Sequence, residues 1–267
     1  MSNGCVCCTM RGDLIRVLAG LMKRQASAAR GFDAIIVETT GLADPGPVAQ
    51  TFFVDDDVKA KTRLDSVTTV VDAKHVLASL DDSREAREQV AFADQIVLNK
   101  TDLASDAELA AIEARLRRLN LLAPIHRARR GDVPLDAIIG RGGFDLARIE
   151  GLAPAHNPAH GEAGHNHQLD DIRGVSLSLD RPVDGEKISR WLSGVLAAQG
   201  QNILRAKGIL AVAGEERRLV FQAVHMILDG DLQRPWREGE ARVSRMVFIG
   251  RELDEAALKA GFEACVA

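Results

Sequence analysis

The stretch Gln95-Ile96-Val97-Leu98-Asn99-Lys100-Thr101-Asp102 places a polar turn directly after a short apolar run. Such a run is typical of a strand buried in a parallel sheet, and open parallel sheets bind ligands where their strands end. A guanine base offers two adjacent N–H donors, and the carboxylate of Asp102 can accept from both. Asn99 would support the turn and reach the base edge, and Lys100 would lie over the ring. The stretch therefore predicts a guanine site. The alternative is a polar loop in which Asp102 caps the next helix.

Segments of helical and strand-like pattern alternate on both sides of this stretch, within residues 1–149. We expect strands at 32–37, 65–72, 95–99 and 124–128, and helices at 13–30, 47–53, 83–93, 106–119 and 134–139. The alternation predicts an α/β domain with a mostly parallel sheet and right-handed crossovers. The helix at 83–93 is rich in charged side chains and is expected to be exposed.

The composition changes after residue 149. Residues 150–170 contain four histidines, several prolines and glycines and almost no large apolar side chain, which predicts a flexible linker. Histidine-rich tracts bind metal ions, so His156, His160, His165 and His167 predict a metal buffer, with a solvated linker as the alternative. Residues 171–267 predict a smaller α+β domain, with strands at 172–179, 203–212, 218–225 and 242–249 and helices at 184–199 and 254–265. Asp254 is expected to cap the second of these helices.

A second polar turn, Glu38-Thr39-Thr40-Gly41, follows the strand expected at 32–37. A carboxylate at a strand end, here that of Glu38, can hold Mg²⁺ or orient an attacking water. Gly41 lets its backbone amide approach a γ-phosphate because no side chain stands in the way. Residues 42–45 would then form a switch segment that senses this phosphate. The alternative is a strand-to-helix turn capped by Thr39 or Thr40.

Three of the four cysteines, Cys5, Cys7 and Cys8, are clustered near the start of the chain. Zn²⁺ and Cu⁺ favour thiolate ligands, and three thiolates on one loop leave a coordination position open, which suits metal transfer. The helix expected from about residue 9 would favour the thiolate form through its N-terminal field. The alternatives are a redox thiol pair and incidental buried cysteines. Cys265, alone on an apolar helix face, is expected in the core.

The bulk properties narrow the class of protein. A net charge of −4 gives no electrostatic argument for nucleic acid or an anionic membrane surface as a partner. No apolar run approaches the ~20 residues of a membrane span. The first residues lack a basic stretch followed by an apolar one, so we expect no signal peptide. With cysteines clustered for thiol or metal chemistry, these properties predict a cytoplasmic location.

Taken in order, these motifs resemble the CobW family of P-loop GTPases over nearly the whole chain. The first part of the resemblance lies in Gly4-Cys5-Val6-Cys7-Cys8, residues 38–45, Val71-Asp72-Ala73, the Asn99 turn and the His-rich linker. The second part lies in Arg205-Ala206-Lys207-Gly208, Gln222-Ala223-Val224-His225, Trp236 and Phe248-Ile249-Gly250.

The resemblance implies a P-loop NTPase-like domain (residues 1–149), the linker (150–170) and a CobW C-terminal domain (171–267). It implies a GTP-dependent metal chaperone or insertase that uses GTP and Mg²⁺ and delivers Zn²⁺ or Co²⁺, as in cobalamin biosynthesis. Cys5, Cys7 and Cys8 would hold this metal, and a client metalloprotein or metal-insertion enzyme would be the partner, with a homodimer left open. The alternatives are a non-hydrolysing metal-binding or interaction protein of the same family and a cysteine redox protein.

One feature of that family is not found in these 267 residues, namely the Gly-x-x-x-x-Gly-Lys-Ser/Thr loop that precedes the cysteines. The nearest glycine-rich stretch, Gly140-Arg141-Gly142-Gly143, lacks the Lys-Ser/Thr. We therefore expect Met1 to be an internal methionine of a longer protein, with the first strand and phosphate loop upstream. A chain that starts at Met1 is expected to bind GTP weakly, because charge-assisted contacts to the phosphates are the strong ones.

Overall fold

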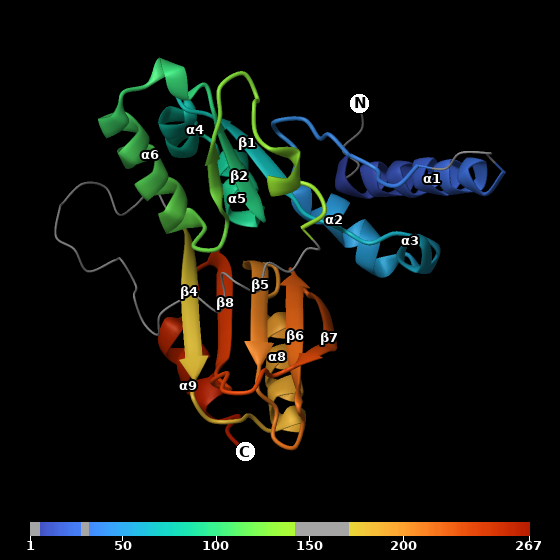
Figure 1. Cartoon of the computed structure of the whole chain (residues 1–267), viewed down its shortest axis with the longest axis vertical. Coiled ribbons are helices and arrows are strands. Elements are labelled where there is room, and N and C mark those ends of the chain that lie inside the picture. Colours follow the sequence, from blue (N-terminus) through green and yellow to red (C-terminus); the bar gives the residue numbers. More distant parts are fainter. Residues whose placement is uncertain (1–5, 28–31, 142–170) are drawn as a thin grey trace.

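A computed structural model describes residues 6–27, 32–141 and 171–267, with side chains for residues 12–24 only in the first of these ranges. The chain forms two sheets, each with its own helices (Figure 1). The elements before residue 142 are α1 (Val6–Ser27), α2 (Pro45–Val54), α3 (Asp56–Lys61), β1 (Thr68–Asp72), α4 (Val76–Asp82), α5 (Arg84–Phe92), β2 (Gln95–Asn99), the 3₁₀ turn η1 (Thr101–Leu103), α6 (Asp106–Leu119), β3 (Ile125–Arg127) and η2 (Leu135–Ala137). The elements after residue 170 are β4 (Ile172–Leu179), α8 (Gly185–Gln199), β5 (Ile203–Leu210), β6 (Arg217–Val224), β7 (Ile227–Pro235), β8 (Ser244–Arg251) and α9 (Glu255–Glu263).

The first sheet is parallel, in the order β1-β2-β3, which confirms the predicted α/β class. The apolar run in β2 is buried, and Ile96 and Leu98 are fully enclosed in the core that they share with α4, α5 and α6. The register pairs Asp72 of β1 with Asn99 of β2. Both strands therefore end at the same edge, and the polar turn after β2 lies beside the residue that ends β1.

Helix α6 begins with a capping box. The Ser105 side chain accepts from the backbone N–H of Glu108, and the Glu108 carboxylate accepts from the backbone N–H of Ser105. These two contacts satisfy orphan N–H groups at the helix start. The apolar face of α6 then packs into the core of the first half through Leu109, Ile112, Leu116 and Leu119. The alternative in which Asp102 caps this helix is wrong.

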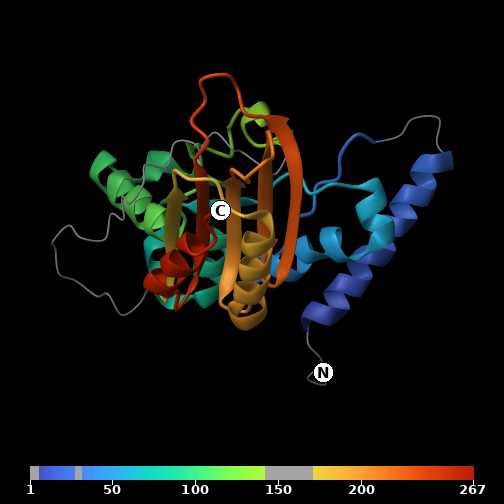
Figure 2. The same ribbon diagram turned by 90° about the horizontal axis from the view of Figure 1, so that it is seen from below.

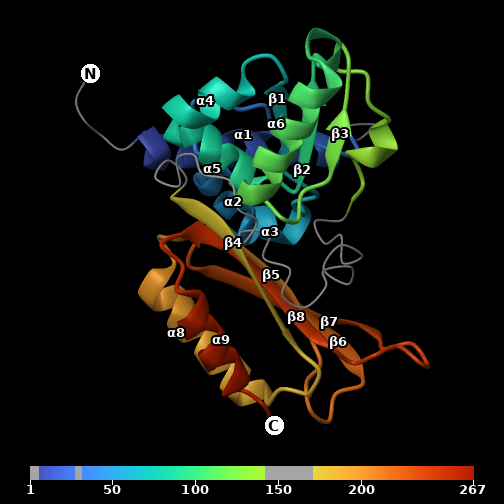
Figure 3. The same cartoon turned by 90° about the vertical axis from the view of Figure 1, so that its left-hand side faces the viewer.

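The second sheet is antiparallel, in the order β4-β8-β5-β6-β7. Figure 3 shows α8 and α9 on one face of this sheet and the first half of the chain on the other. Alternation along the strands produces both faces, because successive side chains point to opposite sides. In β8, Met246 and Phe248 join the core under α8 and α9, whereas Val247 and Ile249 join the core shared with the first half. As predicted, Asp254 caps α9 and Cys265 is buried.

A buried ion cluster joins the two halves. Asp94, just before β2, accepts from Arg205 at 2.6 Å and from Lys207, both on β5, and its second oxygen accepts from the backbone N–H of Val67 at 2.9 Å. The side chains of Asp94, Arg205 and Lys207 are 7%, 3% and 10% exposed. Burial by itself would raise the pKa of Asp94, but the two cations outweigh it and hold the pKa below its usual value.

Three expectations about the first half are wrong. Residues 32–37 form no strand, and Ile36 is 81% exposed. A strand needs a neighbour for its backbone groups, and within the described ranges β1 has β2 as its only strand neighbour. Helix α1 begins at Val6, so Cys7 and Cys8 lie inside its first turn and not on a loop before it. The helix at 83–93 is α5, whose last residues Val90–Phe92 are buried, not exposed.

Helices α1, α2 and α3 lie together beside the parallel sheet, and α1 extends away from the rest of the molecule (Figure 2). A small core of Leu18, Met22 and Val58 holds them together. None of the described helices is long and apolar enough to cross a membrane.

Candidate functional site

The Asn99 turn is fixed by the strands on either side of it. The side-chain oxygen of Asn99 accepts from the backbone N–H of Gly131 at 2.9 Å, and its backbone oxygen accepts from Ala73 at 2.9 Å. The next residue but one, Thr101, donates from its hydroxyl to Ala128 O at 3.0 Å. Asn99 therefore ties the segments after β1 and β3 to the end of β2, as the predicted supporting role requires.

Lys100 adopts the left-handed conformation, with φ 60°. Its ammonium group lies 2.8 Å from Oδ2 of Asp72, at the end of β1. This hydrogen bond from Lys100 is the main reason that the pKa of Asp72 lies below its usual value. The ion pair is half exposed, so its effect is to orient the lysine stem across the sheet edge more than to stabilise the fold.

Asp72 was not among the residues predicted to act at the site, although it lies in the segment Val71-Asp72-Ala73 that carries the family resemblance. The signal that finds it is the register. A parallel neighbour of β2 that ends with a carboxylate opposite Asn99 has to bring this carboxylate to the same edge.

Asp102 lies in the exposed 3₁₀ turn η1. Ser105 caps the following helix, and the carboxylate of Asp102 makes no hydrogen bond to any other residue in the described part of the chain. Both of its oxygens remain able to accept from a ligand. An ionised carboxylate that accepts two N–H donors in a fixed turn matches the N1–H and N2–H edge of guanine.

Glu38 and Gly41 lie in the segment after the residues that form no strand. Glu38 is exposed, and Gly41 begins a turn in which Ala43 N–H donates to Thr40 O at 3.0 Å. No described contact joins either residue to the Asn99 turn, so the structure does not bring the two predicted parts of the site together. Asp44, with Oδ1 accepting from Gly46 N at 2.8 Å, caps α2. The alternative in which Thr39 or Thr40 caps this helix is therefore wrong.

The predicted metal ligands fall largely outside the described residues. Cys5 and the His-rich linker (150–170) lie beyond the described ranges, and Cys7 and Cys8 are placed by backbone only, at the start of α1. Within the described part of the chain, no three His, Cys, Asp or Glu side chains form a group able to hold a metal. The metal-site assignment is thus still a prediction.

Comparison with known families divides the chain into two parts. Residues 1–127 match the family model described as the CobW/HypB/UreG nucleotide-binding domain. Residues 172–266 match that of the cobalamin synthesis protein cobW C-terminal domain. The first match includes β1, β2 and the Asn99 turn. The second includes the whole antiparallel sheet together with α8 and α9.

Several known proteins are similar to this chain over both of these parts. The zinc chaperone YjiA of Escherichia coli is 36% identical over 262 residues, which cover 98% of this chain and 80% of the relative. The zinc chaperone CobW of a Sinorhizobium species is 32% identical, over 100% of this chain and 80% of the relative. The crystal structure of Zn(II)-bound YjiA GTPase from E. coli superposes with a TM-score of 0.76 at 33% identity, over 100% of this chain and 79% of that one.

A third relative is similar over the first half of this chain only. The zinc-regulated GTPase metalloprotein activator 1 of Schizosaccharomyces pombe is 41% identical over 126 residues, which cover 47% of this chain and 30% of the relative.

Proposed function

Because the chain belongs to the CobW/HypB/UreG family of GTPase metallochaperones, we propose that it is a GTP-dependent metal chaperone in which GTP hydrolysis is coupled to transfer of Zn²⁺. Co²⁺ is the second candidate cargo. The client is a metalloprotein or a metal-insertion enzyme, and a homodimer is compatible with this role. The observation that carries the nucleotide part is the Asn99 turn, in which Asp102 keeps a free carboxylate at the end of a buried parallel strand.

Each residue of the turn has a separate task in this proposal. Asp102 accepts from N1–H and N2–H of the base and so selects guanine over adenine. Asn99 keeps the turn in place through its bonds to the segments after β1 and β3, and reaches the other edge of the base. The stem of Lys100, held by Asp72, covers the ring. None of these tasks requires a conformational change before the base binds.

The phosphate end of the nucleotide depends on Glu38 and Gly41. Mg²⁺ uses one or two carboxylates together with substrate phosphate oxygens and water. Glu38 fits that donor set, because its carboxylate is exposed on a segment without regular structure. The proposal requires this segment to approach the sheet edge when the nucleotide binds. Mg²⁺, when bound, would neutralise negative charge on the phosphate oxygens. Glu38 would position the metal or the attacking water, and the amide of Gly41 would contact the γ-phosphate.

The metal cargo is assigned to Cys5, Cys7 and Cys8. The start of α1 at Val6 places Cys7 and Cys8 in the first turn of a helix, where backbone N–H groups and the helix field favour the thiolate form. Thiolate is the form that binds Zn²⁺, so this position supports the assignment.

We expect the variant C5S/C7S/C8S to lose its metal. The unsubstituted chain should retain about one Zn²⁺ after gel filtration, and the triple variant should retain only background, because serine hydroxyls are poor ligands for Zn²⁺. The measurement is the zinc content per chain by elemental analysis.

The matched control is C265S, which changes a buried cysteine that follows α9 and whose Sγ donates to the Gly261 carbonyl of that helix. This variant should retain its zinc. Unchanged zinc in the triple variant would contradict the assignment. Activity that is lost on alkylation but indifferent to chelators would instead support the redox alternative.

A further inference from the structure

Helix α5 and the C-terminal sheet together hold the segment that follows Gly41. The amide nitrogen of Gln89, on α5, donates to Gly41 O at 3.0 Å and to Ala43 O at 2.9 Å. Both donors of one amide are thus used on two carbonyls of a single turn. The turn itself is closed by the Ala43 to Thr40 hydrogen bond. Gln89 is therefore the residue that fixes this turn to the first half of the molecule.

The C-terminal domain reaches the same segment through His225. This residue forms the tight turn between β6 and β7, with a left-handed φ of 52°. Its imidazole lies over Gly46, in the first turn of α2: a Cβ added to Gly46 would lie 2.6 Å from Nε2 of His225. Real Cβ atoms essentially never lie so close to another atom, so a side chain at position 46 would force the imidazole to move from this position. The absence of a side chain at Gly46 is what lets His225 approach.

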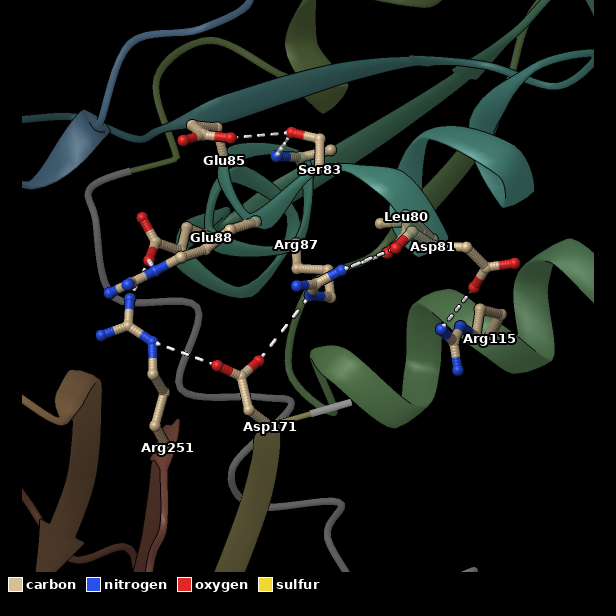
Figure 4. A network of polar contacts seen from close by, with 11 residues as sticks. Leu80, Asp81, Ser83, Glu85, Arg87, Glu88, Arg115, Asp171 and Arg251 are labelled. Carbon is tan, nitrogen blue, oxygen red and sulfur yellow. Dashed lines mark hydrogen bonds and ion pairs between the residues drawn. The ribbon is translucent and has the colours of Figure 1, made fainter. Parts of the chain in front are cut away.

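Two further contacts connect α5 to the C-terminal domain. Glu88, next to Gln89, pairs with Arg251 of β8, and the side chains of both residues are largely buried. Arg87, the residue before Glu88, donates to Leu80 O at 2.7 Å and lies 3.7 Å from Asp171 (Figure 4). Asp171 also lies 3.7 Å from Arg251. Helix α5 therefore binds the Gly41 turn through Gln89 and contacts the C-terminal domain through Glu88 and Arg87.

We propose that Gln89 and His225 are positioning residues that clamp the segment Gly41–Gly46 between α5 and the C-terminal domain. This segment begins with Gly41, whose amide is assigned to the γ-phosphate, so any movement of the segment on nucleotide binding is transmitted to the β6–β7 turn. The inference rests on the proposed function for its nucleotide part only. The clamp itself is a property of the fold and can be measured without nucleotide.

The first test is amide hydrogen exchange of the full chain without nucleotide. H225N keeps a residue that tolerates the left-handed conformation but is too short to cover Gly46. Q89L keeps the size of the side chain and removes both donors. We expect Q89L to raise exchange of residues 40–46 by about tenfold, the effect of losing its two hydrogen bonds. H225N should raise this exchange by a smaller factor, because it removes only the packing of the imidazole over Gly46. The control is E85Q, an exposed residue in the first turn of the same helix. Exchange like that of the control in both variants would overturn the clamp.

The second test is a double-mutant cycle between the two domains. G46A should raise exchange of residues 40–46 in the unsubstituted background, because the new methyl group displaces the imidazole. In the H225N background the same substitution should have a smaller effect, limited to the 3.1 Å approach of the new Cβ to Oδ1 of Asp44, since the effects of contacting residues are not additive. Additive effects of G46A and H225N would show that the two residues do not touch, and would overturn the proposal.

The third test adds a non-hydrolysable GTP analogue with Mg²⁺. We expect it to change exchange at the β6–β7 turn in the unsubstituted chain and not in H225N, because coupling between two sites is reciprocal. A change of equal size in H225N would overturn the transmission step. If the analogue does not bind at all, the proposed function fails, and the first two tests still decide whether the clamp exists.

Discussion

Replacing Asp94 by asparagine is expected to reduce the free energy of unfolding by about 3–5 kcal/mol, the usual result of removing one member of a buried ion cluster. Arg205 and Lys207 would remain buried and would lose the carboxylate that they share, while Arg205 stays above the ring of Phe92, 5.0 Å from its centroid. The measurement is urea-induced unfolding followed by far-UV circular dichroism and by the fluorescence of the two tryptophans.

The control for this prediction is D229N. Asp229 also faces the other half, through Lys59 at 3.8 Å, but the side chains of both residues are about half exposed. Exposed pairs contribute little, so D229N should change stability by less than about 1 kcal/mol. In contrast, D94L/R205M/K207M removes all three charges and should recover much of the loss. If D94N were as stable as D229N, the ion cluster would not be what joins the two halves.

The same cluster predicts a dependence on pH. The pKa of Asp94 is lower in the folded chain than in the unfolded one, so its contribution to the free energy of unfolding is complete at pH values above the unfolded pKa. This contribution is lost as the pH falls through the folded pKa.

Substitution of Asp102 by asparagine is expected to lower the affinity for guanine nucleotides by about 100-fold or more, because two charge-assisted hydrogen bonds are lost and a donor faces N1–H and N2–H. The same amide offers a donor to the C2 carbonyl of xanthine, so affinity for xanthosine nucleotides should rise. Titration of the full chain with fluorescent guanosine and xanthosine nucleotides measures both changes.

Asp106 provides the matched control, since it is an exposed acidic residue in the first turn of α6, four positions along the chain. D106N should leave both affinities within about threefold, the range of a surface charge change. Retention of guanine affinity in D102N would remove the guanine site from this turn. Equal losses in D102N and D106N would point to a general charge effect instead.

Residues with a strong periodic or buried pattern were predictable from the sequence. The apolar run of β2, the amphipathic face of α6 and the cap at Asp254 all appear where expected. The prediction of a strand at 32–37 was wrong. Its apolar run is typical of a strand that is buried on both faces, but such burial requires a neighbouring strand, and the run itself carries no information about that neighbour. Strand β7 escaped prediction because it lies at the sheet edge, where residues such as Asp229, Gly230 and Pro235 are tolerated.

At the site, the sequence indicated which residues belong to the Asn99 turn, but it did not indicate which distant segments contact one another. Asn99, Lys100 and Asp102 follow one strand, so one strand end brings them together. The interdomain contacts had no such signal. Gln89 and His225 are separated by more than a hundred residues from each other, and their meeting at the Gly41–Gly46 segment depends on the packing of α5 against the second sheet. Position along the chain carries little information about contacts of that kind.

The central claim is that guanine nucleotide and metal cargo are coupled in one protein. The most direct measurement is the Zn²⁺ affinity of the full chain, by competition with a chromophoric chelator, in the presence of Mg²⁺ with GTP, with GDP or with ATP. We predict that affinities in GTP and GDP differ by at least about fivefold, the lower end of measured couplings between sites, and that ATP has no effect. Equal Zn²⁺ affinity in all three nucleotides, at concentrations where GTP is shown to be bound, would contradict the account.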